Sequence, residues 1–463
     1  MIRDLVSHVI DNRPNGAHVE ARYHQRKYTN VRIEKGRIER AIVDDYAGIG
    51  VRVLADGAWG YASTSRLENA AVEEALNNAY RAAKNLARTK KDKIELAPIK
   101  PVTGTYKSIG KDPFENHSLE EIVDLAKKTD KAILDADDNI KGSMVWLREP
   151  RNHRIIMNSD GTEVELFDSR PSNLVQAVAS EAGKVIPFMD SIGIAGGWEI
   201  FEKRPLEDMV EKSVRMALQL LNAPMAKGGK HTIVMTPAVV GIICHEAIGH
   251  TAEADIVMSG SAAAGKIGKR VASEHVTLVD SGEQEYAAGW LAVDDAGVKA
   301  ERTVMIEKGI MNSYLHSRYS AHHYGVEPTG NERAFEYDNE PIIRMRNTYL
   351  EPGNFSEDEI LEDVKFGYFC VDPGGGQADS NAEFMFNMFE AYEINNGEVG
   401  KLVRNVALTG NAFEVLESVD AVGKDWVLNV GAGHCGKGQA AKVDGGGGTT
   451  RAVALVSGEA GGA

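Results

Sequence analysis

Two histidines, His245 and His250, stand five residues apart and flank the carboxylate Glu246. The residues that lead into this pattern, Val239 to Cys244, are almost all apolar, so we expect the segment to be buried. Buried imidazoles and a buried carboxylate need partners, because polar groups are costly to remove from water without them. This pattern limits the possible structures of the chain more than any other. A metal ion bound to both imidazoles would give these buried groups the partners that they need.

The spacing of the two histidines predicts an irregular helix. The Thr-Pro pair at 236–237 is a favourable helix start, and one helix over Ala238–Met258 would carry both histidines. Side chains five residues apart on a regular α-helix point roughly 140° apart around its axis. We therefore expect a π-type turn that absorbs one residue and brings His245 and His250 together. Gly249, directly before the second histidine, would ease this deformation.

Two imidazoles do not complete a catalytic zinc site, which uses three protein ligands and one open position. Glu253 and Asp255 are close by in the sequence, although Glu253 equally fits a partner that orients an imidazole. Cys435 is the other candidate, because its small neighbours leave the sulfur accessible and Lys437 would favour the thiolate. Glu246 is suited to take a proton from the attacking water and pass it to the leaving amine.

Length and composition limit the number of domains, the kinds of partner and the cellular compartment. A chain of 463 residues predicts two or three domains, and we place a boundary at residues 222–229, where proline and glycine end a helical pattern. The formal charge of −16 argues against nucleic acid or a membrane surface as the partner. We find no run of about 18 apolar residues and expect no signal peptide at Met1–Asp4. Three cysteines are too few for a disulfide framework and indicate the cytoplasm.

The N-terminal half predicts strands followed by helices. Lys35-Gly36 supplies the positive φ of a tight hairpin between two strand-like runs. Alanine and leucine recur at helical spacing in residues 66–88, and Ser118 starts a second helix as an N-cap. A third helix is expected over Pro205–Leu221.

The C-terminal half is expected to be mainly β-structure. Strand-like runs occur at Thr303–Ile306, Glu390–Ile394 and Lys401–Leu408. The glycine-rich residues Gly445–Gly448 and Gly461–Gly462 read as loop or chain end.

Several blocks in a fixed order carry a resemblance. Residues 245–255 read His-Glu-Ala-Ile-Gly-His-Thr-Ala-Glu-Ala-Asp, a His-Glu-x-x-x-His motif continued by acidic residues. The further blocks are Gly330–Arg333, Arg344–Tyr349, Gly374–Gln377, Glu390–Tyr392 and Cys435–Gln439. Together they cover most of the C-terminal half, and they resemble the catalytic, TldD-like branch of the TldD/PmbA family of metallopeptidases.

The resemblance implies the site and its cofactor. It implies one divalent metal ion per catalytic chain, for which zinc is expected. The metal ligands would be His245, His250 and Cys435, with Glu246 as the catalytic base.

The resemblance also implies the fold. We expect an α+β chain of two domains. Residues 1–225 would form an N-terminal α/β domain of meander strands and long helices, and residues 226–463 a mainly β domain that contains the metal-binding helix.

The function implied is a metal-dependent endopeptidase that cleaves unfolded peptides or small proteins held in extended conformation as an added β-strand. Family members form dimers, so we expect a homodimer or a heterodimer with a related subunit that lacks the motif. The alternative is a non-catalytic peptide-binding subunit of a hetero-oligomeric protease, which would not need the intact His–Glu–His set. Hydrolysis of a small-molecule amide is a third possibility.

Four further residues form a polar and aromatic cluster that we assign to substrate binding, with a plain polar loop as the alternative. They are His316, Arg318, Tyr319 and His322.

Three more residues complete the candidate set. Gly375 and Gln377 are assigned to substrate binding, since the glycines at 374–376 let the backbone of another chain or of a peptide approach closely. Glu253 is assigned as the partner that orients a metal-binding imidazole. Residues 260–267 nearly spell a phosphate-binding loop, but the final Ser or Thr is missing and no strand precedes them, so we predict no nucleotide site.

Overall fold

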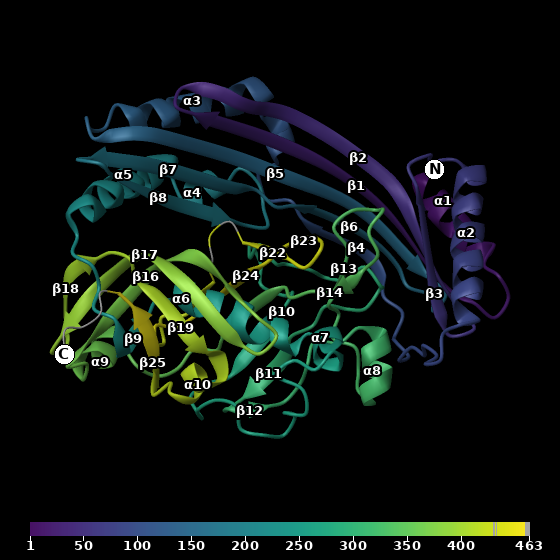
Figure 1. The fold of residues 1–463 in the computed structure, drawn as a ribbon. Helices are drawn as coiled ribbons and strands as arrows, with labels where there is room; N and C mark the ends of the chain where they lie inside the picture. Colours follow the sequence, from purple (N-terminus) through teal and green to yellow (C-terminus); the bar gives the residue numbers. More distant parts are fainter. Residues whose placement is uncertain (429–430, 432, 459–463) are drawn as a thin grey trace.

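A long, mostly antiparallel sheet from the N-terminal half arches over a β-rich C-terminal half (Figure 1). The computed structural model describes residues 1–428, 431 and 433–458. The fold is α+β, which confirms the predicted class, whereas the division of the chain at residue 225 stays a prediction. Within the described residues, no helix is long and apolar enough to cross a membrane.

The N-terminal sheet has the strand order β3-β2-β1-β5-β6-β4, and β7 pairs with both β5 and β8. The predicted hairpin is present, with Lys35 and Gly36 at φ 46° and 75° in the turn between β1 and β2. The strands are β1 (His18–Glu34), β2 (Arg37–Ala55), β3 (Ala58–Thr64), β4 (Thr103–Ser108), β5 (Ile140–Asn158), β6 (Glu163–Ser169), β7 (Ser172–Glu181) and β8 (Lys184–Gly193).

Helices cover the two ends of this sheet, and the C-terminal half lies against its middle (Figure 1). Helices α1 and α2 pack on β1–β3, α2 through an alanine-rich stripe, and α3 and α5 pack on β5, β7 and β8. The three predicted helices correspond to α2, α3 and α5. The helical segments are α1 (Ile2–Asp11), α2 (Asn69–Ala87), η1 (Phe114–Asn116), α3 (Leu119–Leu134), α4 (Ile200–Lys203) and α5 (Leu206–Asn222).

The C-terminal half contains a sheet that closes on itself. Its order is β16-β9-β25-β19-β17, and β17 pairs back onto β16. The ring strands are β9 (Gly229–Met235), β16 (Phe366–Ala378), β17 (Glu383–Asn395), β19 (Ala407–Asn411) and β25 (Thr450–Ser457), with β18 (Glu398–Val403) and β20 (Ala421–Val422) attached.

A second sheet and two short hairpins complete the β-structure. The sheet runs β12-β11-β10-β15-β24-β21. Its strands are β10 (Leu278–Ser281), β11 (Thr303–Glu307), β12 (Ile310–Met311), β15 (Asn347–Leu350), β21 (Val427–Leu428) and β24 (Asp444–Gly447). The hairpins are β13 (Glu332–Arg333) with β14 (Ile342–Ile343), and β22 (His434–Gly436) with β23 (Ala440–Lys442).

The glycine run near the C-terminus is a buried strand, so its prediction as loop was wrong. Strand β24 lies between β15 and β21. A Cβ atom at Gly446 would lie 1.9 Å from the carbonyl oxygen of Val427, so only glycine permits this close approach of backbones. Gly461 and Gly462 fall outside the described residues.

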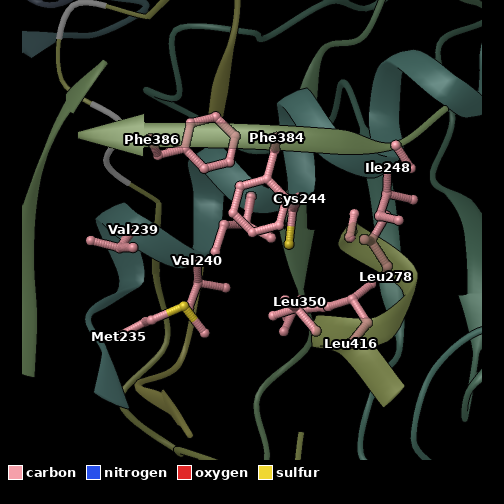
Figure 2. Close-up of a cluster of buried hydrophobic side chains, with 14 of the residues drawn as sticks. Met235, Val239, Val240, Cys244, Ile248, Leu278, Leu350, Phe384, Phe386 and Leu416 are labelled. Atoms are coloured by element: carbon pink, nitrogen blue, oxygen red, sulfur yellow. The ribbon is translucent and has the colours of Figure 1, made fainter. Parts of the chain in front are cut away.

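The segment that carries the histidines starts as predicted and then departs from a regular helix. Helix α6 (Pro237–Ile242) continues into a π-helical turn, η2 (Ile243–Gly249), which confirms the predicted distortion. Figure 2 shows its apolar side chains, among them Val240 and Cys244, packed against Phe384 and Phe386 of β17. Burial of this kind stabilises by about 1.5–3 kcal/mol for each large aliphatic side chain.

The prediction of one helix to Met258 was wrong. A 3₁₀ turn, η3 (His250–Ala252), follows the π turn, and a separate short helix, α7 (Ala254–Met258), comes next. The helix breaks because its backbone pairs elsewhere: the amide of Leu315 donates to Ala252 and its carbonyl accepts from Ala254. The remaining helices are α8 (Arg318–Tyr324), α9 (Glu357–Glu362) and α10 (Ala412–Glu417).

Gly249→Ala is expected to destabilise the protein. A Cβ atom at this position would lie 1.8 Å from Sδ of Met345, whose side chain is fully buried. Overpacking of this kind costs about 1–3 kcal/mol. Denaturant unfolding of the variant beside Gly400→Ala, where a Cβ meets nothing closer than 3.6 Å, measures the difference. Equal stability of the two variants would contradict the tight packing of the π turn.

Candidate metal centre

Three side chains converge at the C-terminal end of the π turn. The ligand atoms of His245, His250 and Cys435 all lie within 4.8 Å of one another. The Sγ atom of Cys435 is 3.1 Å from Nε2 of His250, and the two imidazole rings stand nearly perpendicular, with centroids 5.2 Å apart. The π turn η2 supplies the imidazole of His245, the 3₁₀ turn η3 that follows it supplies that of His250, and the hairpin β22–β23 supplies the thiol.

The arrangement fits a bound metal ion. His245 is 5% exposed, and among the described residues neither of its ring nitrogens has a hydrogen-bond partner. A buried imidazole without partners is costly unless something else satisfies it. Two nitrogens and one sulfur are a donor set that suits zinc and leaves a fourth position open.

Electrostatics favour the thiolate form of Cys435. Burial opposes this charge, but the nearby imidazoles of His245 and His250 outweigh it and lower the pKa of the thiol to about 4. Burial likewise opposes a charge on His250, yet its contacts with Cys435 and Glu253 raise the pKa of that imidazole to about 10. In the absence of metal the two groups therefore form a thiolate–imidazolium pair. A metal ion would take the place of the proton, since the ligand forms are the thiolate and the neutral imidazole.

Glu246 lies beside the ligands with its carboxylate open to solvent. Its Oε2 is 3.8 Å from Nε2 of His250, and its side chain is 29% exposed. It lines two cavities that meet at this point. A carboxylate so placed can exchange a proton with a molecule bound at the metal site.

Glu253 lies where a partner that orients His250 is expected. Its carboxylate is fully buried, and Oε2 is 3.4 Å from Nδ1 of His250. The same oxygen accepts a hydrogen bond from Nζ of Lys437 at 2.7 Å, and Lys437 also donates to Asp255 at 2.7 Å. The ammonium group of Lys437 therefore pairs with carboxylates, whereas the sequence suggested that it would stabilise the thiolate. Its contacts tie the Cys435 hairpin to the segment after His250.

Buried arginines hold the hairpin that carries Cys435. Arg344 donates to the carbonyl oxygen of Cys435 at 2.8 Å and to that of Gln439 at 2.5 Å. Arg333 donates to the carbonyl oxygens of Lys442 and Met345 at 2.8 and 2.6 Å. Sequence reasoning used these arginines only as part of matching blocks and missed this role. No sequence signal identified this role, because arginine is ordinarily exposed and its burial here depends on distant carbonyl partners.

The larger of the two cavities at Glu246 lies between the N-terminal sheet and the C-terminal half, and the smaller one lies within the C-terminal half. The larger encloses about 1020 Å³, open to solvent, between His245 on one side and Leu174 and Met189 of the N-terminal sheet on the other. The smaller extends past His250 to Lys437. Figure 1 shows the strands β7 and β8 above the C-terminal half at this place.

One wall of these cavities is a strand edge. Gly375 lines the larger cavity, Gln377 lines the smaller one, and Gly376 lines both. Strand β16 pairs with β9 only over Gly367–Cys370. Over the described part of the chain, no strand pairs with this edge beyond Cys370, so its backbone groups face the site of Glu246.

The structure does not bring the other predicted substrate residues to these cavities. None of the four is among the residues that line them: His316, Arg318, Tyr319 and His322. Arg318 is buried and donates to Asp160 at 2.6 Å and to the carbonyl oxygen of Ala97, which joins the two halves of the chain. His316 is buried beside Ser320 and aromatic rings, and burial lowers the pKa of its imidazole to about 4.

Sequence comparisons match nearly the whole chain to one family. The model described as the PmbA/TldA metallopeptidase C-terminal domain matches residues 228–445. The models of domain 1 and of the central domain of the same family match residues 19–83 and 112–221.

Curated relatives and solved structures agree with this match. A protein named as a metalloprotease from Methanocaldococcus jannaschii is 36% identical, with 96% of this chain and 97% of that protein covered. A protein named zinc metalloprotease TldD homolog from Saccharolobus solfataricus is 30% identical over 86% and 87% of the two chains.

Two solved structures share the fold. A proposed modulator of DNA gyrase from Thermotoga maritima has a TM-score of 0.79 at 22% identity, with 98% of each chain covered. TldE from Thermococcus kodakarensis has a TM-score of 0.77 at 20% identity, with 98% of this chain and 99% of that chain covered. The protein therefore belongs to the PmbA/TldA family of metallopeptidases, a family of peptide hydrolases.

Proposed function

We propose that this protein is an endopeptidase that uses one divalent metal ion, zinc in our assignment, bound by His245, His250 and Cys435. The observation that carries the proposal is the convergence of these three donors beside Glu246 at an open cavity. Two nitrogens and a thiolate form a stronger site for zinc than for magnesium or calcium, which prefer oxygen. The zinc named for the Saccharolobus solfataricus relative supports the same choice.

Different residues of the site would take different roles in the hydrolysis of the peptide bond. A divalent ion bound there would polarise the carbonyl of the scissile bond and acidify a water molecule. Glu246 would take the proton from that water and deliver it to the leaving nitrogen. Glu253, held by Lys437, would keep the ring of His250 in one orientation and one protonation state.

The substrate we propose is an unfolded peptide or small protein in extended conformation. The free edge of β16 beside Glu246 supports this choice, because an extended peptide can add to such an edge through backbone hydrogen bonds. A folded protein rarely offers an unpaired strand, and the site lies between two layers of the structure. Small residues at Gly374–Gly376 allow the backbone of the peptide to come close to the strand.

We expect a dimer in the cytoplasm, formed either by two copies or with a related subunit that lacks the motif. Light scattering of the purified chain together with a peptide-cleavage assay separates these cases. A mass of two chains with activity would support the homodimer. Cleavage that appears only after a second subunit is added would support the heterodimer, and an active monomer would contradict both.

Purified protein is expected to contain about one divalent ion per chain, and Cys435→Ala is expected to lower that occupancy strongly. Loss of the thiolate leaves two ligands, too few for tight binding. Elemental analysis after gel filtration is the measurement. Cys370→Ala is the matched control, because burial raises the pKa of that thiol to about 12 and it lies outside the metal site. Full metal content in Cys435→Ala would disprove the ligand assignment.

Glu246→Gln is expected to keep the metal and to lose peptide cleavage. Removal of a general acid–base lowers the rate by about 10²–10⁴-fold. The rate of cleavage of an internally quenched peptide and the metal content are measured on the same sample, with the exposed Glu274→Gln as control. Undiminished cleavage by metal-loaded Glu246→Gln would rule out the proposed role. A different outcome, absence of cleavage by the parent protein itself, would instead favour the alternative of a peptide-binding subunit.

A further inference from the structure

The larger cavity at Glu246 has mainly apolar walls. None of the described residues that line it is a lysine or an arginine, and Glu246 is the only carboxylate among them. The large apolar side chains are Leu174 of β7, Met189 of β8, Ile242 of α6, Pro373 of β16, Phe389 of β17 and Val443 before β24. The polar side chains are those of Ser191, His434, His245 and Glu246. An apolar lining with a few polar groups is typical of cavities that bind a ligand.

The N-terminal sheet turns one face toward this cavity. Leu174 is paired with Ser191 between β7 and β8, and Met189 lies two residues before Ser191 on the same strand. Cross-strand partners and residues two apart lie on the same face of a sheet, so these three side chains point to one side. The opposite face of β8 carries Phe188, which is buried against α5. The apolar wall at Leu174 and Met189 is therefore separate from the core of the N-terminal half.

Strand β17 adds a ring to the same cavity from the C-terminal half. Phe386 and Met388 are buried in the core that packs on the π turn. Phe389 instead faces the N-terminal sheet, with its ring centroid 5.8 Å from that of Phe188. A Cβ atom at Gly374 would lie 3.1 Å from the Phe389 ring, so this ring lies directly beside strand β16.

The free edge of β16 fixes how a bound peptide would meet these side chains. A peptide strand added at Gly374–Gly376 would continue the two faces of the sheet, and its side chains would alternate between them. One residue would then face the N-terminal sheet at Leu174 and Met189, and its two neighbours would face away. A Cβ atom at Gly375 would meet nothing within 4 Å, which leaves room for the peptide at this edge.

We propose that this cavity binds one large apolar side chain of the peptide, and that the position of this side chain determines which bond is cut. The inference rests on the endopeptidase function proposed above and specifies its substrates. His245 and Glu246 line the same cavity as Leu174 and Met189, so the bound side chain belongs to a residue at or next to the scissile bond.

An acidic side chain would be disfavoured in this cavity. It would lose its water among apolar groups and would also lie near the carboxylate of Glu246. The competing view is that the apolar walls only join the two halves of the chain, and it requires no preference among peptides.

Cleavage of designed peptides by the metal-loaded protein tests the inference. A neutral peptide of alanine, serine and glycine would carry one leucine, moved by one residue from peptide to peptide, and mass spectrometry of the products would identify the bond that is cut. We expect this bond to move with the leucine at a fixed spacing. We also expect kcat/KM to be roughly tenfold to a hundredfold higher with leucine than with alanine, the effect of burying a large apolar side chain. Glutamate at the same position should give no increase over alanine.

Variants of Met189 locate the preference in this cavity. Met189→Ala should lower the leucine-to-alanine ratio of kcat/KM several-fold, and Met189→Leu should retain most of it. Val185→Ala should keep the full ratio, because Val185 is 61% exposed on the same strand and does not line the cavity. A ratio measured on one sample does not depend on the fraction of active protein.

Three results would overturn the inference. They are cleavage at a fixed distance from a peptide end wherever the leucine stands, equal kcat/KM for leucine and alanine peptides, and an unchanged ratio in Met189→Ala. Absence of cleavage of every peptide by the metal-loaded protein would instead overturn the proposed function on which the inference rests.

Discussion

The buried imidazole of His245 is the constraint on which the rest of the site depends. Its ring nitrogens have no hydrogen-bond partner among the described residues, although the side chain is 5% exposed. Burying such a group is costly unless a ligand satisfies it. The π turn, the glycine before His250 and the distant thiol of Cys435 all follow from that need, because together they place three donor atoms within 4.8 Å.

Two different kinds of packing hold the donors in place. The helix rests on an apolar core with Phe384 and Phe386, as in any globular domain (Figure 2). The Cys435 hairpin is rich in glycine and has few apolar side chains, so Arg333 and Arg344 fix it through its carbonyl oxygens. The same hairpin lines the cavity at Glu246 through His434, so one small element carries a metal ligand and borders the proposed peptide site.

The sequence predicted features that follow from local geometry and missed those set by distant contacts. Two histidines five residues apart can share one metal ion only if the helix is distorted between them, so this distortion could be deduced from His245 and His250. The end of the helix could not, because pairing with Leu315 decides it. The glycine-rich strand β24 was predicted as a loop because glycine is common in loops. Its glycines are explained by the close approach of the Val427 backbone, which the sequence does not show. The roles of Lys437 and Arg344 likewise depend on partners about ninety or more residues away. The residues from His316 to His322 show the opposite error. They were assigned to substrate binding because of their side-chain types, yet they lie outside the cavities at Glu246.

X-ray absorption at the metal edge of the loaded protein tests the central claim most directly. The account predicts one sulfur at about 2.3 Å and two imidazole nitrogens at about 2.0–2.1 Å around zinc, with a light atom in the fourth position. A shell made only of nitrogen and oxygen would show that Cys435 is not a ligand. That result would contradict the three-donor site from which the proposed function is derived.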